Sequence, residues 1–324
     1  MKVQVIGLGG IGKNLLKTIN QKNGLIKSKL GEKIEIVSVS DTSGTVITDG
    51  MPLLRIIQAK ESGGLKEIES FEKMSALKAI KDIDSDLVVE LTQSTLDGSP
   101  GLNHVIAAME NEKDVVTANK GVLTTGINMF EKVKEYGRKM RYEATVCGSI
   151  PVFSLMDYSI QPASIISISG FFNATSSFIA SKMGEGMSRE AAIDQAIKIG
   201  LAEKNYRDDI EGIDSARKSI ILHRRVFGSS ISMKDVQFKN IKEGLVPGNR
   251  LFSEITESGI QIGYIHVDRM NGNKNGIEAP MSINFKTDIF DSLSLTVDHD
   301  GPVESAAAVL NDIMLIAKEK MMKQ

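Results

Sequence analysis

The stretch Gly7-Leu8-Gly9-Gly10-Ile11-Gly12 decides how the N-terminal half of this 324-residue chain folds. It is a GxGxxG sequence that follows an expected strand at 3–6 and precedes a helical pattern at 11–19. In such a turn the first glycine permits the tight bend, the second lets the backbone approach a pyrophosphate, and the third lets helix and strand pack closely. The start of the helix then presents amide groups to the phosphates. The turn therefore predicts a dinucleotide site that uses Gly7, Gly9, Gly10, Ile11 and Gly12.

Short β-branched runs alternate with amphipathic helical patterns through the first half of the chain, which is typical of a parallel α/β sheet. We expect further strands at 34–39, 87–91, 115–117 and 141–146. Helices are expected at 102–109 and 127–140, and the polar segment 21–31 is expected to be a surface loop. The pattern predicts a Rossmann-type doubly wound parallel sheet.

The order of elements changes after Gly148, with helices expected at 151–158, 189–200 and 213–227 and alternating strands between 236 and 296. Such alternation is typical of an antiparallel sheet with one covered face. We predict a dinucleotide-binding domain at 1–148, joined by a returning C-terminal helix at 302–324. An α+β substrate and dimerisation domain with a largely antiparallel sheet is predicted at 149–301. The other face of that sheet would pair with a second subunit, so we expect a homodimer.

Composition and charge exclude several classes of function. The net charge is −2 and the chain has no basic block, so we expect neither a nucleic-acid partner nor a membrane partner. No apolar run is long enough to span a bilayer, and the first strand pattern begins at Lys2, which leaves no room for a signal peptide. The one cysteine, Cys147, fits a reducing compartment, and the four histidines lack zinc-ligand spacing. We expect a cytoplasmic protein without a catalytic zinc.

Asp41 follows the second expected strand, where a carboxylate accepts hydrogen bonds from the adenosine ribose hydroxyls. No arginine follows it closely to receive a 2′-phosphate, so we expect NAD in preference, with NADP left open. An aspartate at a strand end is also a common turn residue, which is the alternative explanation of Asp41.

Three segments hold more polar groups than a core or a loop requires. The first, TANKG at 117–121, places Lys120 at the carboxyl end of an expected parallel strand, where ligands bind in open α/β sheets. The second is GFFNAT at 170–175, and the third runs from 202 to 218. In the third, Asp214 and Lys218 are four residues apart and share one helix face. Taken alone, that pair would be explained as well by a solvated ion pair.

Taken together, these segments resemble the homoserine dehydrogenase family over nearly the whole chain. The likeness lies in TANKG, GFFNATSSFI from Gly170, AEKNYRDDIEGIDSARK from Ala202 and EATVCGSIP from Glu143, behind the glycine turn. The resemblance implies a cytoplasmic oxidoreductase of threonine and methionine biosynthesis, which interconverts L-homoserine and L-aspartate 4-semialdehyde with NAD(P).

The resemblance also implies roles for single residues. Thr92, Asn119 and Lys120 would lie near the nicotinamide. The substrate would be held by Thr175, Glu203, Asp208 and Asp214, with Glu203 facing its ammonium group. Lys218 and Lys120 would approach the reacting oxygen, and two neighbouring ammonium groups lower the pKa of at least one of them. We expect Lys218 to transfer the proton, although the two lysine roles can be exchanged.

The family further implies a monovalent cation such as sodium, held by backbone carbonyls at Glu143, Val146, Gly148 and Ile150. We expect no regulatory amino-acid-sensing domain in this chain. The sequence departs from the family pattern at Leu201, where a tyrosine is expected, and at Asn173-Ala174, where a glycine usually precedes the threonine. These departures bear on substrate affinity and cofactor preference more than on the type of reaction.

Two other functions remain open at this point. A cysteine-dependent aldehyde dehydrogenase would use Cys147 as the nucleophile, although a small buried hinge residue explains Cys147 as well. A dinucleotide-sensing protein without catalysis would keep the fold and lose turnover, and the presence of Lys120, Asp214 and Lys218 argues against it.

Overall fold

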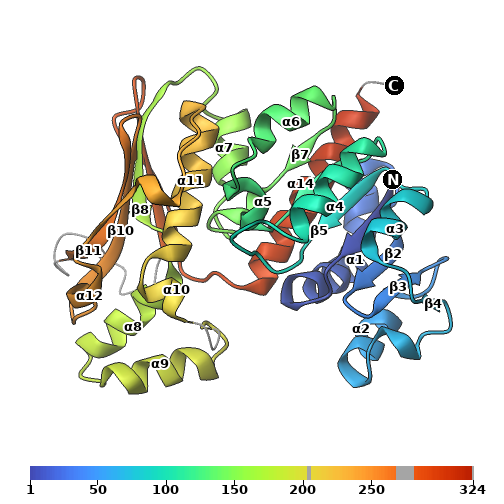
Figure 1. The fold of residues 1–324 in the computed structure, drawn as a ribbon, viewed down its shortest axis with the longest axis horizontal. Helices are drawn as coiled ribbons and strands as arrows, with labels where there is room; N and C mark the ends of the chain where they lie inside the picture. The colour runs from blue at the N-terminus through green and yellow to red at the C-terminus, as the bar shows by residue number, and fades with distance from the viewer. Residues whose placement is uncertain (203–205, 268–280, 323–324) are drawn as a thin grey trace. The chain divides into compact units, whose positions relative to one another are not determined.

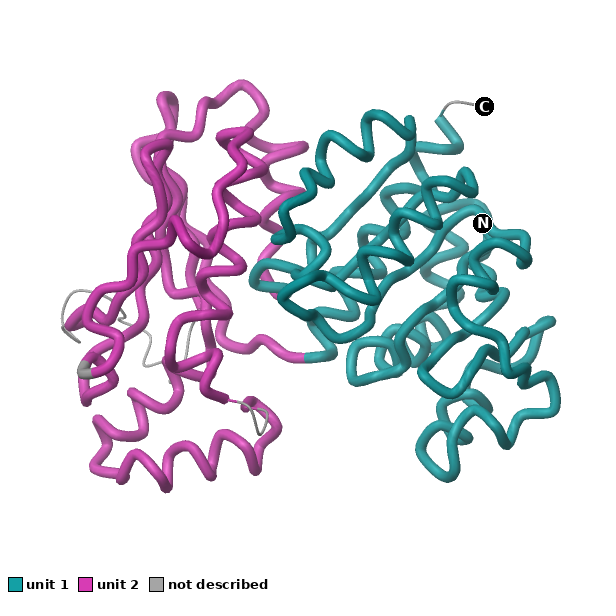
Figure 2. The backbone as a smooth tube through the Cα atoms, in the orientation of Figure 1, with its two compact units in different colours: residues 1–148, 302–324 teal, residues 149–301 magenta. Residues whose placement is uncertain are grey.

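The computed structural model describes residues 1–202, 206–267 and 281–322. The chain forms two compact units, shown in Figure 2. Unit 1 consists of Met1–Gly148 and Pro302–Gln324, and unit 2 is Ser149–Gly301. Among the residues described, no helix combines the length and the apolar character that a bilayer crossing requires.

Unit 1 is built on a seven-stranded sheet in the order β4-β3-β2-β1-β5-β6-β7. The pairs from β2 to β7 are parallel, and β3 and β4 extend one edge in antiparallel pairing. This confirms the expected Rossmann-like sheet. The strands are β1 (Lys2–Ile6), β2 (Glu35–Asp41), β3 (Gly44–Ile47), β4 (Phe71–Glu72), β5 (Leu87–Glu90), β6 (Asp114–Thr117) and β7 (Met140–Arg141).

Helices cover this sheet, and the C-terminal helix α14 packs beside α1 in one apolar core (Figure 1). Both helices contribute fully buried side chains, for example Leu15 and Leu16 from α1 and Ile313 and Ile316 from α14. The helices of unit 1 are α1 (Gly10–Leu30), α2 (Leu53–Ser62), α3 (Ala76–Asp82), α4 (Gly101–Glu110), α5 (Lys120–Thr124), α6 (Met129–Glu135) and α14 (Pro302–Met321).

Three local expectations for unit 1 are wrong. The segment 21–31 is not a loop, because α1 continues to Leu30 and ends at Gly31 in a left-handed conformation with φ 72°. Ile26 and Leu30, four residues apart, bury one side of this otherwise polar helical segment. The helix expected at 127–140 is shorter, at Met129–Glu135. The strand expected at 141–146 is instead a two-residue strand followed by a 3-10 turn, Glu143–Thr145.

Unit 2 contains a six-stranded sheet in the order β13-β12-β8-β10-β11-β9. All its pairs are antiparallel except β11 with β9, so the expected second, largely antiparallel sheet is confirmed. Its strands are β8 (Ile165–Phe171), β9 (Val236–Lys239), β10 (Asn249–Thr256), β11 (Gly259–His266), β12 (Met281–Thr287) and β13 (Leu293–Val297).

One face of this sheet is buried beneath helix α11 (Ile213–Phe227), which contacts β10 and β11 (Figure 1). Ile168, Ile255 and Ile283 are completely buried on that face, while the alternate residues Ser167, Glu254 and Lys286 are not buried. The other helices of unit 2 are α7 (Val152–Tyr158), α8 (Ala174–Gly184), α9 (Arg189–Lys198), α10 (Arg207–Ile210) and α12 (Ile241–Gly244).

Candidate functional site

The glycine turn of unit 1 has the shape that a dinucleotide requires. A Cβ atom added to Gly12 would lie 2.2 Å from the Gly7 carbonyl oxygen, and one added to Gly7 would lie 2.6 Å from the carbonyl carbon of Leu91. A Cβ atom on Gly9 would meet nothing within 4 Å. Gly7 and Gly12 are therefore needed to close the turn, whereas Gly9 keeps an open space beside the start of α1. This open cradle fits a pyrophosphate.

Asp41 is the last residue of β2, which pairs with β1, the strand that leads into the glycine turn. Its carboxylate already has partners within unit 1. Its Oδ2 lies 2.5 Å from the Lys60 ammonium on α2, and its Oδ1 accepts hydrogen bonds from the Ser43 amide and hydroxyl at 2.7 and 2.6 Å. Burial by itself would raise the pKa of Asp41, but Lys60 and Ser43 outweigh burial and hold that pKa below its usual value. Asp41 is thus a fixed, ionised acceptor.

Asn119 joins the ends of β5 and β6. Its side chain accepts a hydrogen bond from the Gly121 amide at 3.0 Å, which caps α5, the helix that begins with Lys120. Its Nδ2 donates to the Thr92 hydroxyl at 3.3 Å. The structure therefore places Thr92, Asn119 and the start of α5 together at the carboxyl edge of the parallel strands.

In unit 2, Lys218 forms a buried charged cluster with Asp214. The Lys218 ammonium lies 2.8 Å from the Asp214 carboxylate and donates to the Phe172 carbonyl at 2.6 Å. Only 7% of Lys218 is exposed. This burial argues against the alternative of a solvated ion pair on a helix surface. The two charges are removed from water, and they are compensated by each other and, for Lys218, by the Phe172 carbonyl.

Asn173 connects the same cluster to a second aspartate. Its Nδ2 donates to Asp209 at 2.7 Å and to Asp214 at 3.2 Å, while its Oδ1 caps α8 through the Ser176 amide. Burial, followed by the negative charge of Asp214, raises the pKa of Asp209 to about 6, although Asn173 and Lys218 act in the opposite direction. Two acidic groups therefore share one enclosed space near Lys218.

The structure places one of the other expected substrate residues near this cluster and another away from it. Thr175 lies near the cluster and donates its hydroxyl to the Leu201 carbonyl at 3.1 Å. Asp208 instead lies 3.4 Å from Arg217, with 41% of its side chain exposed. Its neighbour Asp209 occupies the cluster, and the sequence offered no sign of this, because the orientation of the short helix α10 decides which of two adjacent aspartates points inward. Glu203 lies outside the described residues.

The expected cation carbonyls fall at the junction of the two units. Glu143, Val146 and Gly148 belong to unit 1 and Ile150 belongs to unit 2, so their mutual arrangement is not described. Within 1–202, 206–267 and 281–322, no group of three or more His, Cys, Asp or Glu side chains could hold a metal ion. Cys147 is 1% exposed and adopts a positive φ of 47°, which fits a buried hinge residue better than a nucleophile.

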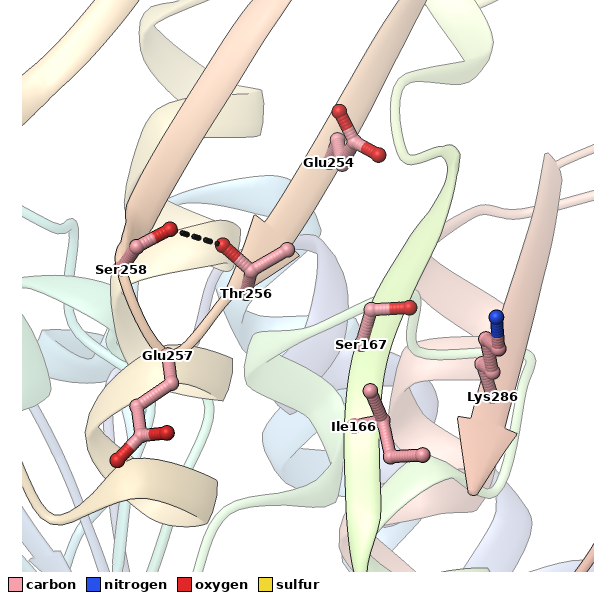
Figure 3. A pocket seen from close by; sticks show the side chains of 7 residues that line it. All are labelled: Ile166, Ser167, Glu254, Thr256, Glu257, Ser258 and Lys286. Atoms are coloured by element: carbon pink, nitrogen blue, oxygen red, sulfur yellow. Dashed lines mark hydrogen bonds between the residues drawn. The ribbon is translucent and has the colours of Figure 1, made fainter. Parts of the chain in front are cut away.

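One surface hollow lies away from all these residues, on the outer face of the unit 2 sheet (Figure 3). Ser167, Glu254 and Lys286 line it from three neighbouring strands. The hydroxyl groups of Thr256 and Ser258, which also line it, are hydrogen bonded to each other at 2.8 Å. It contains no arrangement that matches the expected chemistry.

A dinucleotide cradle on a Rossmann sheet, together with a buried lysine–carboxylate cluster, defines a nicotinamide-dependent dehydrogenase. The model of the homoserine dehydrogenase NAD-binding domain matches residues 7–143, and the model of homoserine dehydrogenase matches residues 151–314. The chain belongs to the homoserine dehydrogenase family. It is an NAD(P)-dependent oxidoreductase that acts on a CH–OH group and interconverts L-homoserine and L-aspartate 4-semialdehyde, a step of amino-acid biosynthesis.

Individual relatives agree over the full length. A homoserine dehydrogenase of Methanocaldococcus jannaschii is 34% identical, with 98% of each chain covered. The crystal structure of homoserine dehydrogenase from Thermoplasma acidophilum superposes with a TM-score of 0.83 at 29% identity and covers 98% of this chain and 99% of that one. A hyperthermophilic archaeal homoserine dehydrogenase in complex with NADPH has the same fold, with a TM-score of 0.84 at 23% identity over 98% of both chains. The family models and the full-length relative favour homoserine dehydrogenase over a cysteine-dependent aldehyde dehydrogenase.

Proposed function

We propose that Lys218 transfers the proton of the substrate hydroxyl in this reaction. The observation that carries the proposal is its buried ammonium, fixed between the Asp214 carboxylate at 2.8 Å and the Phe172 carbonyl at 2.6 Å. A proton-transferring group must be held in one orientation, and two strong acceptors on separate elements achieve this. Asp214 also keeps a compensating charge next to Lys218 when the proton moves. Lys120, in unit 1, is assigned to the same reacting oxygen, and the exchange of the two lysine roles stays open.

The substrate is a zwitterion, and unit 2 supplies groups for each of its charges. We assign its ammonium group to the carboxylates of Asp209, Asp214 and Glu203, because a buried acid with a raised pKa is stabilised in its ionised form by a neighbouring cation. Asp209 thereby takes the role that the sequence suggested for Asp208. Thr175, next to the cap of α8, is assigned to the polar end of the substrate.

Unit 1 is proposed as the dinucleotide-binding domain and unit 2 as the substrate domain. The turn at Gly7–Gly12 would hold the pyrophosphate and Asp41 the adenosine ribose. Thr92, Asn119 and Lys120 would hold the nicotinamide end. When bound, the dinucleotide supplies or accepts the hydride. NAD is the preferred form in this proposal, because Asp41 is an ionised acceptor that a 2′-phosphate would meet unfavourably.

We retain the monovalent cation as part of the proposal, with carbonyl ligands at Glu143, Val146, Gly148 and Ile150. The support is the irregular backbone of this stretch, where a 3-10 turn is followed by the positive φ of Cys147. Such backbone leaves carbonyl groups outside a regular ladder, which is the donor type that hard cations prefer.

A cytoplasmic homodimer is the proposed state of the protein. The outer face of the unit 2 sheet carries Glu254 and Lys286 on neighbouring parts of one surface, and Ile166 is 49% exposed there. A two-fold interface brings a patch onto its own copy, so an acid and a base in one patch can pair across the axis. The buried state of the one cysteine agrees with a reducing compartment. Light scattering of Ile166→Glu, compared with the unaltered protein, tests the dimer.

The central experiment is the initial rate with homoserine and either NAD or NADP, for the unaltered protein and for Lys218→Ala. We expect Lys218→Ala to lower kcat by a factor on the order of 10³, as for loss of a general acid–base group, and to leave NADH binding unchanged. Lys198→Ala, which removes an exposed lysine of the same unit, is the matched control. Turnover of Lys218→Ala at the normal rate would refute the assignment.

A further inference from the structure

Glu90, the last residue of β5, has a buried carboxylate that the proposed chemistry does not use. The residue is 0% exposed. An ionised group in such a position is costly unless its oxygens are hydrogen bonded or paired with a charge. The partners of Glu90 therefore indicate what this carboxylate does.

Both oxygens of Glu90 are engaged. Oε2 lies 2.7 Å from His104 Nδ1, on helix α4, and the His104 side chain is only 8% exposed. Oε1 accepts a hydrogen bond from the Thr92 amide at 2.8 Å and another from the Thr92 hydroxyl. One carboxylate thus ties α4 to the turn that follows β5.

The same network continues to the start of α5. The Thr92 hydroxyl accepts from Asn119 Nδ2, and Asn119 in turn caps the helix that begins with Lys120. Space around the network is closed, because a Cβ atom on Gly101 would lie 2.4 Å from Asn119 Nδ2 and 3.2 Å from Glu90 Oε1. A shift of Glu90 therefore has to move Thr92, Asn119 or α4.

This network also contacts the glycine turn. A Cβ atom on Gly7 would lie 2.9 Å from the Thr92 amide nitrogen, the atom that donates to Glu90. Asp41, which ends β2, is separated from β5 by the intervening strand β1. The approach to Gly7 is made by backbone that the β1–β5 pairing holds, with the Leu91 amide donating to the Ile6 carbonyl at 2.7 Å. The side-chain hydrogen bonds of Glu90 and Thr92 lead instead to Asn119 and the start of α5, so Glu90 acts on one end of the proposed cofactor site.

We propose that Glu90 and His104 form a buried positioning pair for the nicotinamide end of the cofactor site. His104 fixes the Glu90 carboxylate, and Glu90 fixes Thr92, Asn119 and the start of α5. The pair has no role in holding the adenosine half. This inference rests on the proposed assignment of Thr92, Asn119 and Lys120 to the nicotinamide.

The test compares two ligands, NADH and ADP-ribose, which differ by the nicotinamide group. Their dissociation constants would be measured by calorimetry for His104→Ala, Glu90→Ala and Glu90→Gln. For His104→Ala we expect the NADH constant to rise about tenfold and kcat to fall about tenfold, since small displacements of positioning groups cost this much or more. The constant for ADP-ribose should stay within about twofold.

Glu90→Gln provides a rescue within the same design. A glutamine oxygen can still accept both hydrogen bonds from Thr92, so its NADH affinity should lie close to the normal value and well above that of Glu90→Ala. His223→Ala removes a buried histidine of unit 2 and controls for a general loss of stability.

Parallel weakening of NADH and ADP-ribose in His104→Ala would show a merely structural pair and overturn the proposal. Unchanged affinity and turnover in that variant, or a glutamine as damaging as alanine at position 90, would overturn it as well. Failure of the lysine assignment is a separate result. It would appear as normal turnover in Lys218→Ala, and the dissociation constants of NADH and ADP-ribose would still test the positioning pair.

Discussion

The glycine turn of unit 1 and the charged cluster of unit 2 use polar groups in opposite ways. In unit 1 the cofactor cradle consists of backbone around Gly7, Gly9 and Gly12, and the nearby charge of Asp41 is neutralised from the side by Lys60. In unit 2 the charged groups face one another, with Asp209 and Asp214 in one cluster with Lys218. The comparison shows that the glycine turn offers an open space lined by backbone, whereas the cluster of unit 2 brings buried charged side chains close together, an arrangement that suits the proton transfer we propose.

If this contrast is correct, neutralising a charge in the unit 2 cluster should have the largest effect on turnover. In Asp214→Asn the Lys218 ammonium loses its carboxylate at 2.8 Å while remaining buried. We expect kcat to fall by about 10² to 10³, within the range for acid–base groups, with NADH affinity unchanged. Stopped-flow and steady-state rates measure this. A variant that binds NADH poorly but turns over normally would reverse the comparison.

The glycines of unit 1 should show the complementary behaviour, and they form a matched pair. Gly12→Ala places a Cβ atom 2.2 Å from the Gly7 oxygen, so we expect it to lower both the melting temperature and cofactor affinity. Gly9→Ala meets nothing within 4 Å and should leave the melting temperature unchanged, yet lower NADH affinity about tenfold by occupying the pyrophosphate space. Calorimetric unfolding and NADH titration give both readouts. Normal NADH affinity in Gly9→Ala would remove the cradle from the proposal.

The sequence was informative where a property is local. The turn at Gly7–Gly12 was predictable because a missing Cβ atom has the same consequence in every chain that makes this turn. The helical pair Asp214 and Lys218 was predictable from its spacing of four. By contrast, α1 continues through the polar segment 21–31 because Ile26 and Leu30 are buried, and burial depends on elements far along the chain.

Site residues that meet across the fold were the hardest to predict. Glu90 and His104 are fourteen positions apart on different elements, and no periodicity connects them. Asp209, to which our proposal gives the role expected for Asp208, was not predicted because the orientation of α10 decides which aspartate meets Asn173. Segment-level likeness led to the proposed substrate region, and only the packed structure separated one aspartate from its neighbour.

Asp209 gives a further test of the charged cluster, because its contribution to the free energy of unfolding depends on pH. Its pKa rises from 3.8 in the unfolded reference to about 6 in the folded protein, so the folded state holds a proton that the unfolded chain has released in this interval. The free energy of unfolding contributed by Asp209 is therefore lost as pH rises through this window. Asp209→Asn removes this loss, so its stability relative to the unaltered protein should increase across the same window and then level off.

Urea unfolding at several pH values on both sides of this interval measures the effect, with Asp208→Asn as the matched control. Asp208 is half exposed beside Arg217 at 3.4 Å, so its neutralisation should change stability by less than about 1 kcal/mol at any pH. Homoserine KM should rise in Asp209→Asn and stay constant in Asp208→Asn. Identical pH profiles for the two variants would mean that the cluster does not raise the pKa of Asp209.

The smallest expected effect concerns the form of the cofactor, since Asp41 and Lys60 neutralise each other at the end of β2. Removing Asp41 leaves Lys60 free to attract a 2′-phosphate, so Asp41→Ala should shift the ratio of kcat/KM for NAD over NADP toward NADP by about tenfold, or 1.4 kcal/mol. Lys60→Ala should shift the same ratio in the opposite direction. Both variants should leave kcat with saturating cofactor near normal, because neither residue belongs to the charged cluster of unit 2. A fall in kcat as large as that of Asp214→Asn would show that Asp41 and Lys60 act on the reaction and not only on the form of the cofactor, and the contrast between the glycine turn and the charged cluster would then no longer hold.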